Sequence, residues 1–272
     1  MVLESLINPF KAEKRPWEMF FVGIFYATIA LFLSRWIFQE YAGLVMVFFT
    51  VIACVPLMYG TIKMEEQKDL EIKKESKLLK EHWRALSFFT FLFLGITLAF
   101  SFWFIVLPTP ISEQTFAIQS DTIANINNGV TSNATQFGYF TRIVMNNIKV
   151  LIFAILFSFL YGAGSIFILT WNGSVIAAAI GKFFQVGAAS SGLAYMAPMA
   201  LARYLIHGIP EILSYFVAGL AGGIISVAII NHDFASEKFQ RILVDSTDLL
   251  LIAFGLILFA GFLEAYITPI LF

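Results

Sequence analysis

The ionisable residues best placed to do chemistry are a histidine and a glutamate inside an otherwise apolar stretch. His207 and Glu211 are four residues apart, with Gly208 and Pro210 between them. A helix running through both would place their side chains on one face. Pro210 suits the first turn of a helix, where the helix dipole would favour the Glu211 carboxylate. The pair predicts either a polar pocket for a ligand, proton or partner, or a structural cap at a helix start.

A second carboxylate lies near the end of the chain. Glu264 stands between Gly261 and Pro269, close to the end of the last apolar stretch. For either number of membrane spans considered below, this end and the expected helix start at Pro210 fall on the same side of the membrane. We therefore expect His207, Glu211 and Glu264 to share one pocket.

No pattern typical of catalysis accompanies these residues. The sequence contains no HExxH, GxSxG, Walker A or CxxC motif. The three histidines, His82, His207 and His232, fall in different segments, and Cys54 is the one cysteine. We expect no catalytic residue, no metal site and no cofactor. An intramembrane hydrolase with Glu211 or Glu264 as general base stays open, although a nucleophile or metal for it is missing.

The composition of the chain indicates a lipid environment. Hydrophobic residues make up 59% and charged residues 13% of the 272 residues, against about 45–50% and about 25% in soluble domains. The mean hydropathy is +0.83. The fold class expected is all-α, a polytopic transmembrane helix bundle. A formal net charge of −1 gives no indication of a nucleic-acid partner.

Six stretches are long and apolar enough to span a bilayer, which takes about 20 residues. They are 17–38, 41–62, 86–107, 150–171, 210–230 and 247–270. The stretch 172–205 is apolar but broken by Lys182, Gly187, Gly192 and Pro198. It either adds a span at about 175–193 or re-enters without crossing. We expect seven spans, with six as the alternative.

The distribution of Lys and Arg predicts the orientation. The N-terminal tail and the stretch 63–84 are rich in Lys and Arg and belong in the cytoplasm, whereas 108–148 holds only Arg142. The chain then divides into a three-span region 1–107, an extracytoplasmic polar loop 108–148 and a membrane domain 149–272. We expect a multi-pass protein of the cell membrane with a cytoplasmic N-terminus.

The charged stretch 63–84 mixes both signs at helical spacing. Its basic residues are Lys63, Lys68, Lys73, Lys74, Lys77, Lys80 and Arg84, and its acidic residues are Glu65, Glu66, Asp69, Glu71, Glu75 and Glu81. Such a pattern favours a solvated helix. A docking site for a cytoplasmic partner or anionic lipid is the alternative. Because the signs nearly balance, the sequence argues against a strong polybasic lipid switch.

Small and amide residues predict how the helices pack. Gly219 and Gly223 form a GxxxG pattern, with Gly222 beside them, and Gly162 and Gly164 lie in the expected fourth span. Glycines at this spacing let helices approach closely, within a chain or in a dimer. Asn146, Asn147 and Asn172 flank the same span and could cap helix ends or hydrogen-bond between helices. Asn133 fits an N-glycosylation acceptor in the outer loop.

An ordered set of these residues resembles the stage II sporulation protein M family over about residues 140–272. The set is Asn146-Asn147, Gly162, Gly164, Asn172-Gly173, Pro198, the run from His207 to Glu211, then Gly219, Gly222 and Gly223, and the ending from Glu264 to Pro269. The resemblance implies a multi-helix membrane domain. It also implies a scaffold role, since the founding member localises peptidoglycan-degrading partners during engulfment. The two extra N-terminal spans and the helix 63–84 depart from the short bacterial form.

Two functions compete on this basis. The leading one is a non-enzymatic scaffold, embedded in the lipid bilayer, for membrane or envelope protein partners. A second copy of the chain could be one of these partners. Its contact surfaces would be the loop 108–148 and the helix 63–84. The alternative is a transporter or channel for ions or small solutes that uses His207, Glu211 and Glu264, because histidine titrates near neutral pH.

Overall fold

The structure, a computed structural model, describes residues 15–72, 74–130, 135–161, 164–188, 193–231 and 236–271. Its regular structure in these ranges is entirely helical, which confirms the all-α prediction. The helices are α3 (Glu18–Ile37), η1 (Gln39–Tyr41), α4 (Ala42–Glu71), α5 (Glu75–Val106), α6 (Thr109–Thr115), α7 (Ala117–Val130), α8 (Gln136–Tyr161), α9 (Ser165–Ala188), α10 (Leu193–Asn231), α11 (Glu237–Phe262), η2 (Leu263–Ile267) and α12 (Thr268–Leu271).

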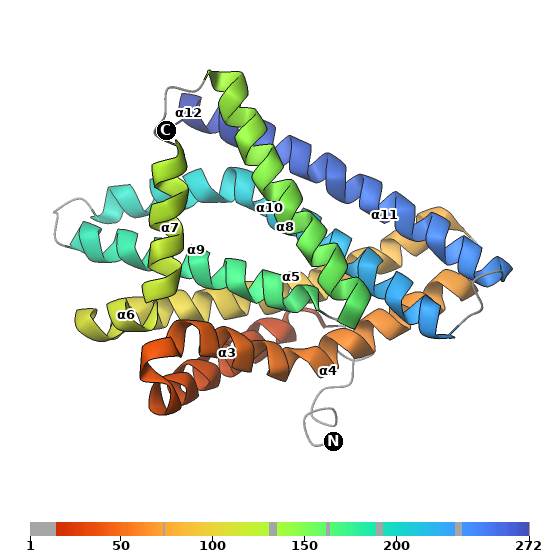
Figure 1. Ribbon diagram of the computed structural model, residues 1–272, viewed down its shortest axis with the longest axis horizontal. Helices are drawn as coiled ribbons and strands as arrows, with labels where there is room; N and C mark the ends of the chain where they lie inside the picture. The colour runs from red at the N-terminus through yellow and green to blue at the C-terminus, as the bar shows by residue number, and fades with distance from the viewer. Residues whose placement is uncertain are drawn as a thin grey trace.

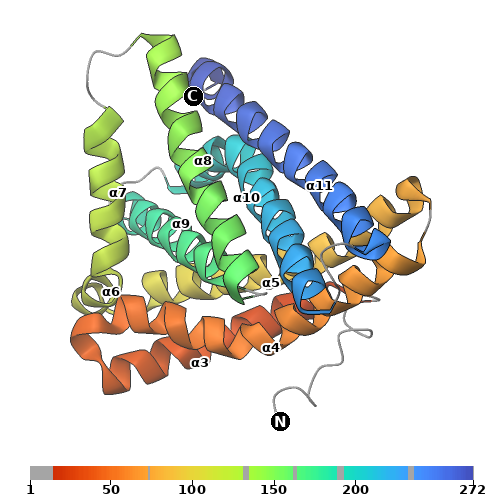
Figure 2. The same cartoon turned by 45° about the vertical axis from the view of Figure 1, so that its right-hand side comes forward.

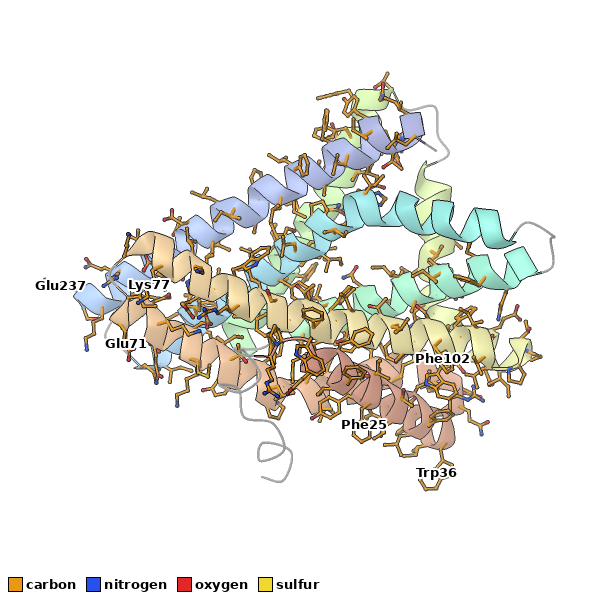
Figure 3. The ribbon with its side chains drawn as sticks, turned by 180° about the vertical axis from the view of Figure 1, so that it is seen from behind. Phe25, Trp36, Glu71, Lys77, Phe102 and Glu237 are labelled. Carbon is orange, nitrogen blue, oxygen red and sulfur yellow. The ribbon has the colours of Figure 1, made fainter. Side chains whose placement is uncertain are left out.

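Seven helices in the described ranges are long and apolar enough to cross a membrane. They cover Glu18–Ile37, Gln39–Glu71, Lys77–Val106, Gln136–Leu160, Ser165–Gln185, Ile206–Asn231 and Glu237–Leu271. Large apolar side chains such as Phe25, Trp36 and Phe102 project outward from them (Figure 3). An exposed apolar surface of this kind suits lipid as the surrounding solvent. The chain is a membrane protein built as a bundle of seven candidate spans.

Arg241 supports seven crossings over six. Its guanidinium donates a hydrogen bond to the backbone carbonyl of Ile72, so the start of α11 lies against the turn between α4 and α5. With seven crossings, the α4–α5 turn and the α10–α11 turn fall on the same side of the membrane. If 172–205 did not cross, the two turns would lie on opposite sides, which this contact forbids.

The bundle has two groups of helices. α3, α4, α5 and α9 run side by side, while α8 and α11 cross them obliquely, and α10 contacts both groups (Figures 1 and 2). Glycines bring α3 and α5 together, because a Cβ at Gly23 would lie 2.4 Å from the Leu92 carbonyl oxygen, and one at Gly95 2.0 Å from that of Phe20. Buried aromatic residues, among them Phe89, Phe93 and Phe216, fill the space between α5 and α10.

The fourth and fifth spans begin earlier than the sequence suggested. The fourth lies in α8 and the fifth at Ser165–Gln185, in place of 150–171 and about 175–193. The chain reverses around Gly164, where a Cβ would lie 2.1 Å from the Phe157 carbonyl oxygen, so only glycine fits. The first half of α8 contains polar residues such as Asn146, which lower its mean hydropathy. The start of this helix was therefore not recognised from the sequence.

The sixth span also differs from the prediction at its start. α10 begins at Leu193, so Pro210 lies inside a continuous helix and not in its first turn. A proline inside a helix cannot donate a hydrogen bond to the carbonyl four residues earlier, here that of Ile206. Membrane helices tolerate this loss where neighbouring groups supply another hydrogen-bond donor. The expected helix-start cap at His207 and Glu211 is therefore wrong. The last span extends from Glu237 to Leu271, longer than the predicted 247–270.

The segment expected as a polar loop, 108–148, is helical where the structure describes it. α6 and α7 precede α8, and α7 lies across α9 (Figure 1). Polar contacts anchor both short helices: Arg35 donates to Thr115 and to the Ile111 carbonyl, and Gln119 Nε2 donates to the Gly43 carbonyl at 2.9 Å. Hydrogen bonds from polar side chains thus fix the positions of these helices. A hydropathy count measures only apolar residues, so it did not predict this ordered structure.

Candidate functional site

Glu211 is flanked by two polar side chains, one from its own helix and one from α8. The Tyr215 hydroxyl, one turn further along α10, donates to Glu211 Oε1 at 2.9 Å. The ring of Tyr215 is fully buried, whereas the Glu211 side chain is half-buried. Asn147 lies beside the same carboxylate from α8, although its Nδ2 is outside hydrogen-bond geometry. Glu211 thus lies between α10 and α8 beside two neutral partners.

Glu264 approaches this group from the end of the chain. It lies in η2, a π-helical turn between α11 and α12, and interacts electrostatically with Tyr215. The start of α8 borders this turn, since Gln136 Nε2 donates to the Ala265 carbonyl at 3.4 Å and the rings of Phe140 and Tyr266 are in contact. π-helical turns occur frequently at functional sites. Glu211 and Glu264, distant in sequence, are brought to one tyrosine.

His207 completes the set from the preceding turn of α10. Because α10 is continuous from Leu193 to Asn231, His207 and Glu211 lie on one helix face, and His207 is half-buried. We call His207, Glu211, Tyr215, Asn147 and Glu264 the Glu211 cluster. Its carboxylates and imidazole could exchange a proton or hold a cation. The sequence pointed to four of its members but missed Tyr215, whose signal was its spacing of four from Glu211.

The other amide residues act more locally. Asn146 Nδ2 donates to Asn147 Oδ1 at 3.4 Å, while Asn172 Nδ2 donates to the Ile168 carbonyl of its own helix at 2.8 Å. Asn172 is therefore inside α9, not at a helix end. Asn133 lies outside the described residues, so its glycosylation stays a prediction.

The predicted packing glycines lie on α10 and at its neighbours. A Cβ at Gly219 would lie 2.5 Å from Ser165 Oγ, and one at Gly222 2.9 Å from the Ile155 carbonyl oxygen. Gly223 is buried in the same helix. This face of α10 packs on α8 and on the start of α9, within the chain. Gly162 lies outside the described residues.

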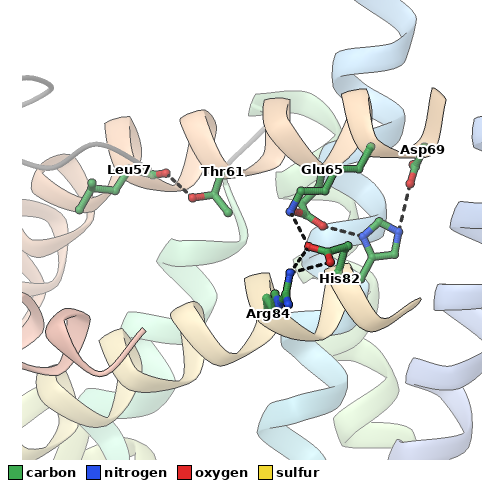
Figure 4. Close-up of polar contacts among 8 residues, drawn as sticks. Leu57, Thr61, Glu65, Asp69, His82 and Arg84 are labelled. Atoms are coloured by element: carbon green, nitrogen blue, oxygen red, sulfur yellow. Dashed lines mark hydrogen bonds and ion pairs between the residues drawn. The ribbon is translucent and has the colours of Figure 1, made fainter. Parts of the chain in front are cut away.

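A second polar cluster, which the sequence did not reveal, joins α4 to α5. Glu65, Asp69 and His82 are each almost completely buried. His82 Nδ1 lies 2.7 Å from Glu65 Oε2, and His82 Nε2 lies 3.1 Å from Asp69 Oδ1 (Figure 4). We call these three residues the His82 cluster. Its signal was the spacing of four between Glu65 and Asp69, which puts both carboxylates on one face of α4.

Two cations surround the His82 cluster. Lys68 Nζ lies 2.5 Å from Glu65 Oε1 and 3.8 Å from Glu81 Oε2, and Arg84 Nη1 lies 2.6 Å from Glu81 Oε1. The imidazole stands between its two carboxylates, so the ligand atoms do not converge on a point. In keeping with this, no group of three or more His, Cys, Asp or Glu side chains in the described ranges is arranged to hold a metal ion.

The His82 cluster lies beyond the apolar part of its helices. α4 and α5 are 30 and 32 residues long, about 45–48 Å, and lipid takes up only about 30 Å. The apolar stretches run to Ile62 on α4 and from Leu86 on α5, so the charged ends project from the membrane. Burial lowers the pKa of His82, but the hydrogen bonds and charges of Asp69 and Glu65 outweigh it and raise the pKa to about 9. His82 is therefore a cation at neutral pH.

Comparison with known families gives a match over most of the chain. The model of the stage II sporulation protein M family covers residues 85–269. The chain belongs to the stage II sporulation protein M family. Family resemblance thus begins at 85, earlier than the 140 inferred from sequence, and takes in most of α5 and the polar segment after it. All five residues of the Glu211 cluster lie within the family match, and the three residues of the His82 cluster precede it.

Neither curated proteins nor solved structures gave a match.

Proposed function

We propose that this family member is a non-enzymatic membrane scaffold that holds envelope-associated protein partners. The observation that carries the proposal is the construction of α6 and α7. Their buried faces are fixed by polar contacts, with Gln119 donating to Ser174 Oγ at 3.2 Å and Gln185 to Ser112 Oγ at 3.1 Å. Their outer faces leave Glu113, Gln114, Asp121 and Asn125 exposed.

A surface built this way suits partner binding. Each short helix is held by side chains from longer helices, so its exposed polar residues stand on a fixed backbone. Binding to a fixed surface avoids the entropic cost of ordering it. The acidic and amide character of the exposed side chains favours a polar or basic partner surface outside the lipid.

Site-specific crosslinking tests the scaffold proposal. A photoreactive residue at Asp121 should give a reproducible protein adduct in intact membranes, and one at lipid-facing Leu251, which is 65% exposed, should give lipid adducts only. The variant Asp121→Arg, combined with a crosslinker at Gln114, should reduce the protein adduct several-fold. If both positions captured only lipid, or if Asp121→Arg changed nothing, the scaffold proposal would fail.

The Glu211 cluster favours a second candidate, a transporter or channel for ions or small solutes. Two half-buried carboxylates, Glu211 and Glu264, interact with the buried Tyr215. The half-buried His207 lies one turn before Glu211 on the same face of α10. Groups of this kind within membrane helices commonly mark ion or proton pathways. Proteoliposomes holding the full chain should then show a flux of protons or alkali cations. Glu211→Gln should abolish that flux while Glu113→Gln, at the exposed end of the molecule, leaves it unchanged.

Absence of any flux for protons, alkali cations, halides and small organic acids would exclude transport. The crosslinking result and the flux result are independent, so the two candidates can be separated.

A further inference from the structure

The charges of residues 63–84 nearly balance in the sequence, but the exposed surface that these residues form is mainly basic. Three of its acidic residues, Glu65, Glu66 and Asp69, point into the protein and are 0%, 2% and 1% exposed. Glu65 and Asp69 contact His82 there, and Lys68 contacts Glu65. Burial therefore removes these carboxylates from the surface that solvent or a ligand meets.

The basic residues of the same stretch remain outside. Lys63, Lys74, Lys77 and Lys80 are exposed, and no ion pair within the described ranges joins them to a carboxylate. Arg84 is neutralised by Glu81. Among the carboxylates of this stretch whose side chains the structure describes, Glu71 alone is exposed. The surface formed by the four lysines, which we call the lysine surface, is thus positively charged.

The lysine surface begins where the apolar part of the bundle ends. Lys63 directly follows Ile62, the last residue of an apolar run on α4. On α5, Trp83 is 58% exposed and Leu79 38% exposed, beside Lys80. Exposed tryptophans are typical of the membrane–water boundary. From Ile62 to Glu71 the helix rises about 14 Å, so the tip of the hairpin, near Lys77 in Figure 3, stays close to the phospholipid headgroups.

We propose that the lysine surface binds the headgroups of anionic phospholipids. Each basic side chain near the bilayer surface adds to this attraction, which fades over about 8 Å in physiological salt. The exposed Trp83 and Leu79 favour lipid over an acidic protein, since they place the surface at the bilayer itself. The proposal does not depend on the scaffold or transport function.

Counting of retained lipids tests this proposal. The full chain is reconstituted in nanodiscs of equal parts phosphatidylglycerol and phosphatidylcholine, released in mild detergent, and weighed with its bound lipids by native mass spectrometry. We expect the wild type to retain phosphatidylglycerol in preference to phosphatidylcholine, and raised salt to reduce this preference. Replacing all four lysines by glutamine should abolish the preference, since each lysine contributes to it separately.

Two control variants fix the interpretation. Replacing the same four lysines by arginine keeps the charge and should keep the preference. Lys182→Gln removes one exposed charge from α9, outside the lysine surface, and should also keep it. A wild type that shows no preference, or a glutamine variant that folds and matches the wild type, would overturn the proposal. So would retention of an acidic protein instead of lipid at the four lysines.

Discussion

Carboxylates are buried at two places in this protein, and they are given different partners. Glu65 and Asp69 share His82, which is positively charged at neutral pH, and Glu65 also contacts Lys68. The partners described for Glu211 are a phenol and an amide, both neutral. The first arrangement neutralises charge and holds two helices together. In the second, the described neighbours do not neutralise the Glu211 carboxylate, and this difference is the basis of the transport candidate.

The family match separates the same two regions. The match begins at residue 85, so the Glu211 cluster lies within it and the His82 cluster lies before it. The His82 cluster precedes the matched residues and joins α4 to α5 in the hairpin that carries the lysine surface. This comparison predicts that the His82 cluster matters chiefly for stability, and the Glu211 cluster chiefly for function.

Removing the central cation should have the largest effect. His82→Ala removes the cation that Glu65 and Asp69 share and leaves Glu65 with Lys68. Breaking a buried ion pair in this way typically costs about 3–5 kcal/mol. The loss can be measured by thermal unfolding in mild detergent, followed by circular dichroism. Arg84→Ala breaks the exposed pair with Glu81 and should cost less than about 1 kcal/mol. Equal losses in the two variants would contradict the buried, structural role of His82.

The same cluster should make stability depend on pH. The folded pKa of His82 is about 9, above the value of about 6.5 in an unfolded chain. Its stabilisation is therefore complete below pH of about 6.5 and is lost as pH rises through about 9, up to about 3 kcal/mol in all. The melting temperature should fall over this range in the wild type and change much less in His82→Gln. A flat profile in the wild type would contradict the ionic description.

Packing of α10 against its neighbours should have the next largest effect. Gly219→Ala would place a Cβ 2.6 Å from Ser165 Cβ, and overpacking of this kind costs about 1–3 kcal/mol. At Gly255 a Cβ meets nothing within 4 Å, so Gly255→Ala should be neutral or slightly stabilising. Thermal unfolding of both variants checks the prediction. If Gly219→Ala behaved like Gly255→Ala, the close approach of α10 to α9 would be wrong.

The Glu211 cluster should show the smallest loss of stability. Tyr215→Phe removes the hydroxyl that donates to Glu211, and a hydrogen bond of this type contributes about 1 kcal/mol. The exposed Tyr59 offers a control, because Tyr59→Phe should change nothing measurable. A loss in Tyr215→Phe as large as that in His82→Ala would erase the difference between the two clusters.

Part of the Glu211 cluster could be predicted from sequence because its residues stand out where they are. An ionisable residue in an apolar stretch is unusual, so His207, Glu211 and Glu264 were found from composition alone. Their common location followed from the side of the membrane on which their helix ends lie. Tyr215 was missed because a tyrosine in a membrane helix is ordinary, and its spacing of four from Glu211 is a weak signal without the contact that the structure shows.

The His82 cluster could not be predicted in this way. Residues 63–84 contain many charges of both signs, and such a pattern is usual for a solvated helix. Which carboxylates turn inward depends on how α4 meets α5, and on α11 reaching Ile72 through Arg241. The sequence shows the charges but not their separation into a buried acidic side and an exposed basic side.

The sequence by itself determined that this is an all-α membrane protein, because long apolar stretches leave the backbone no other way to satisfy its hydrogen bonds in lipid. It also determined the family, through small and polar residues at fixed intervals. Only the tertiary structure decided where α8, α9 and α10 begin, and that the segment after α5 folds into α6 and α7. Hydropathy averages over residues that are neighbours in the sequence. Turns, polar anchors and buried ion pairs depend instead on contacts between residues that are distant in the sequence.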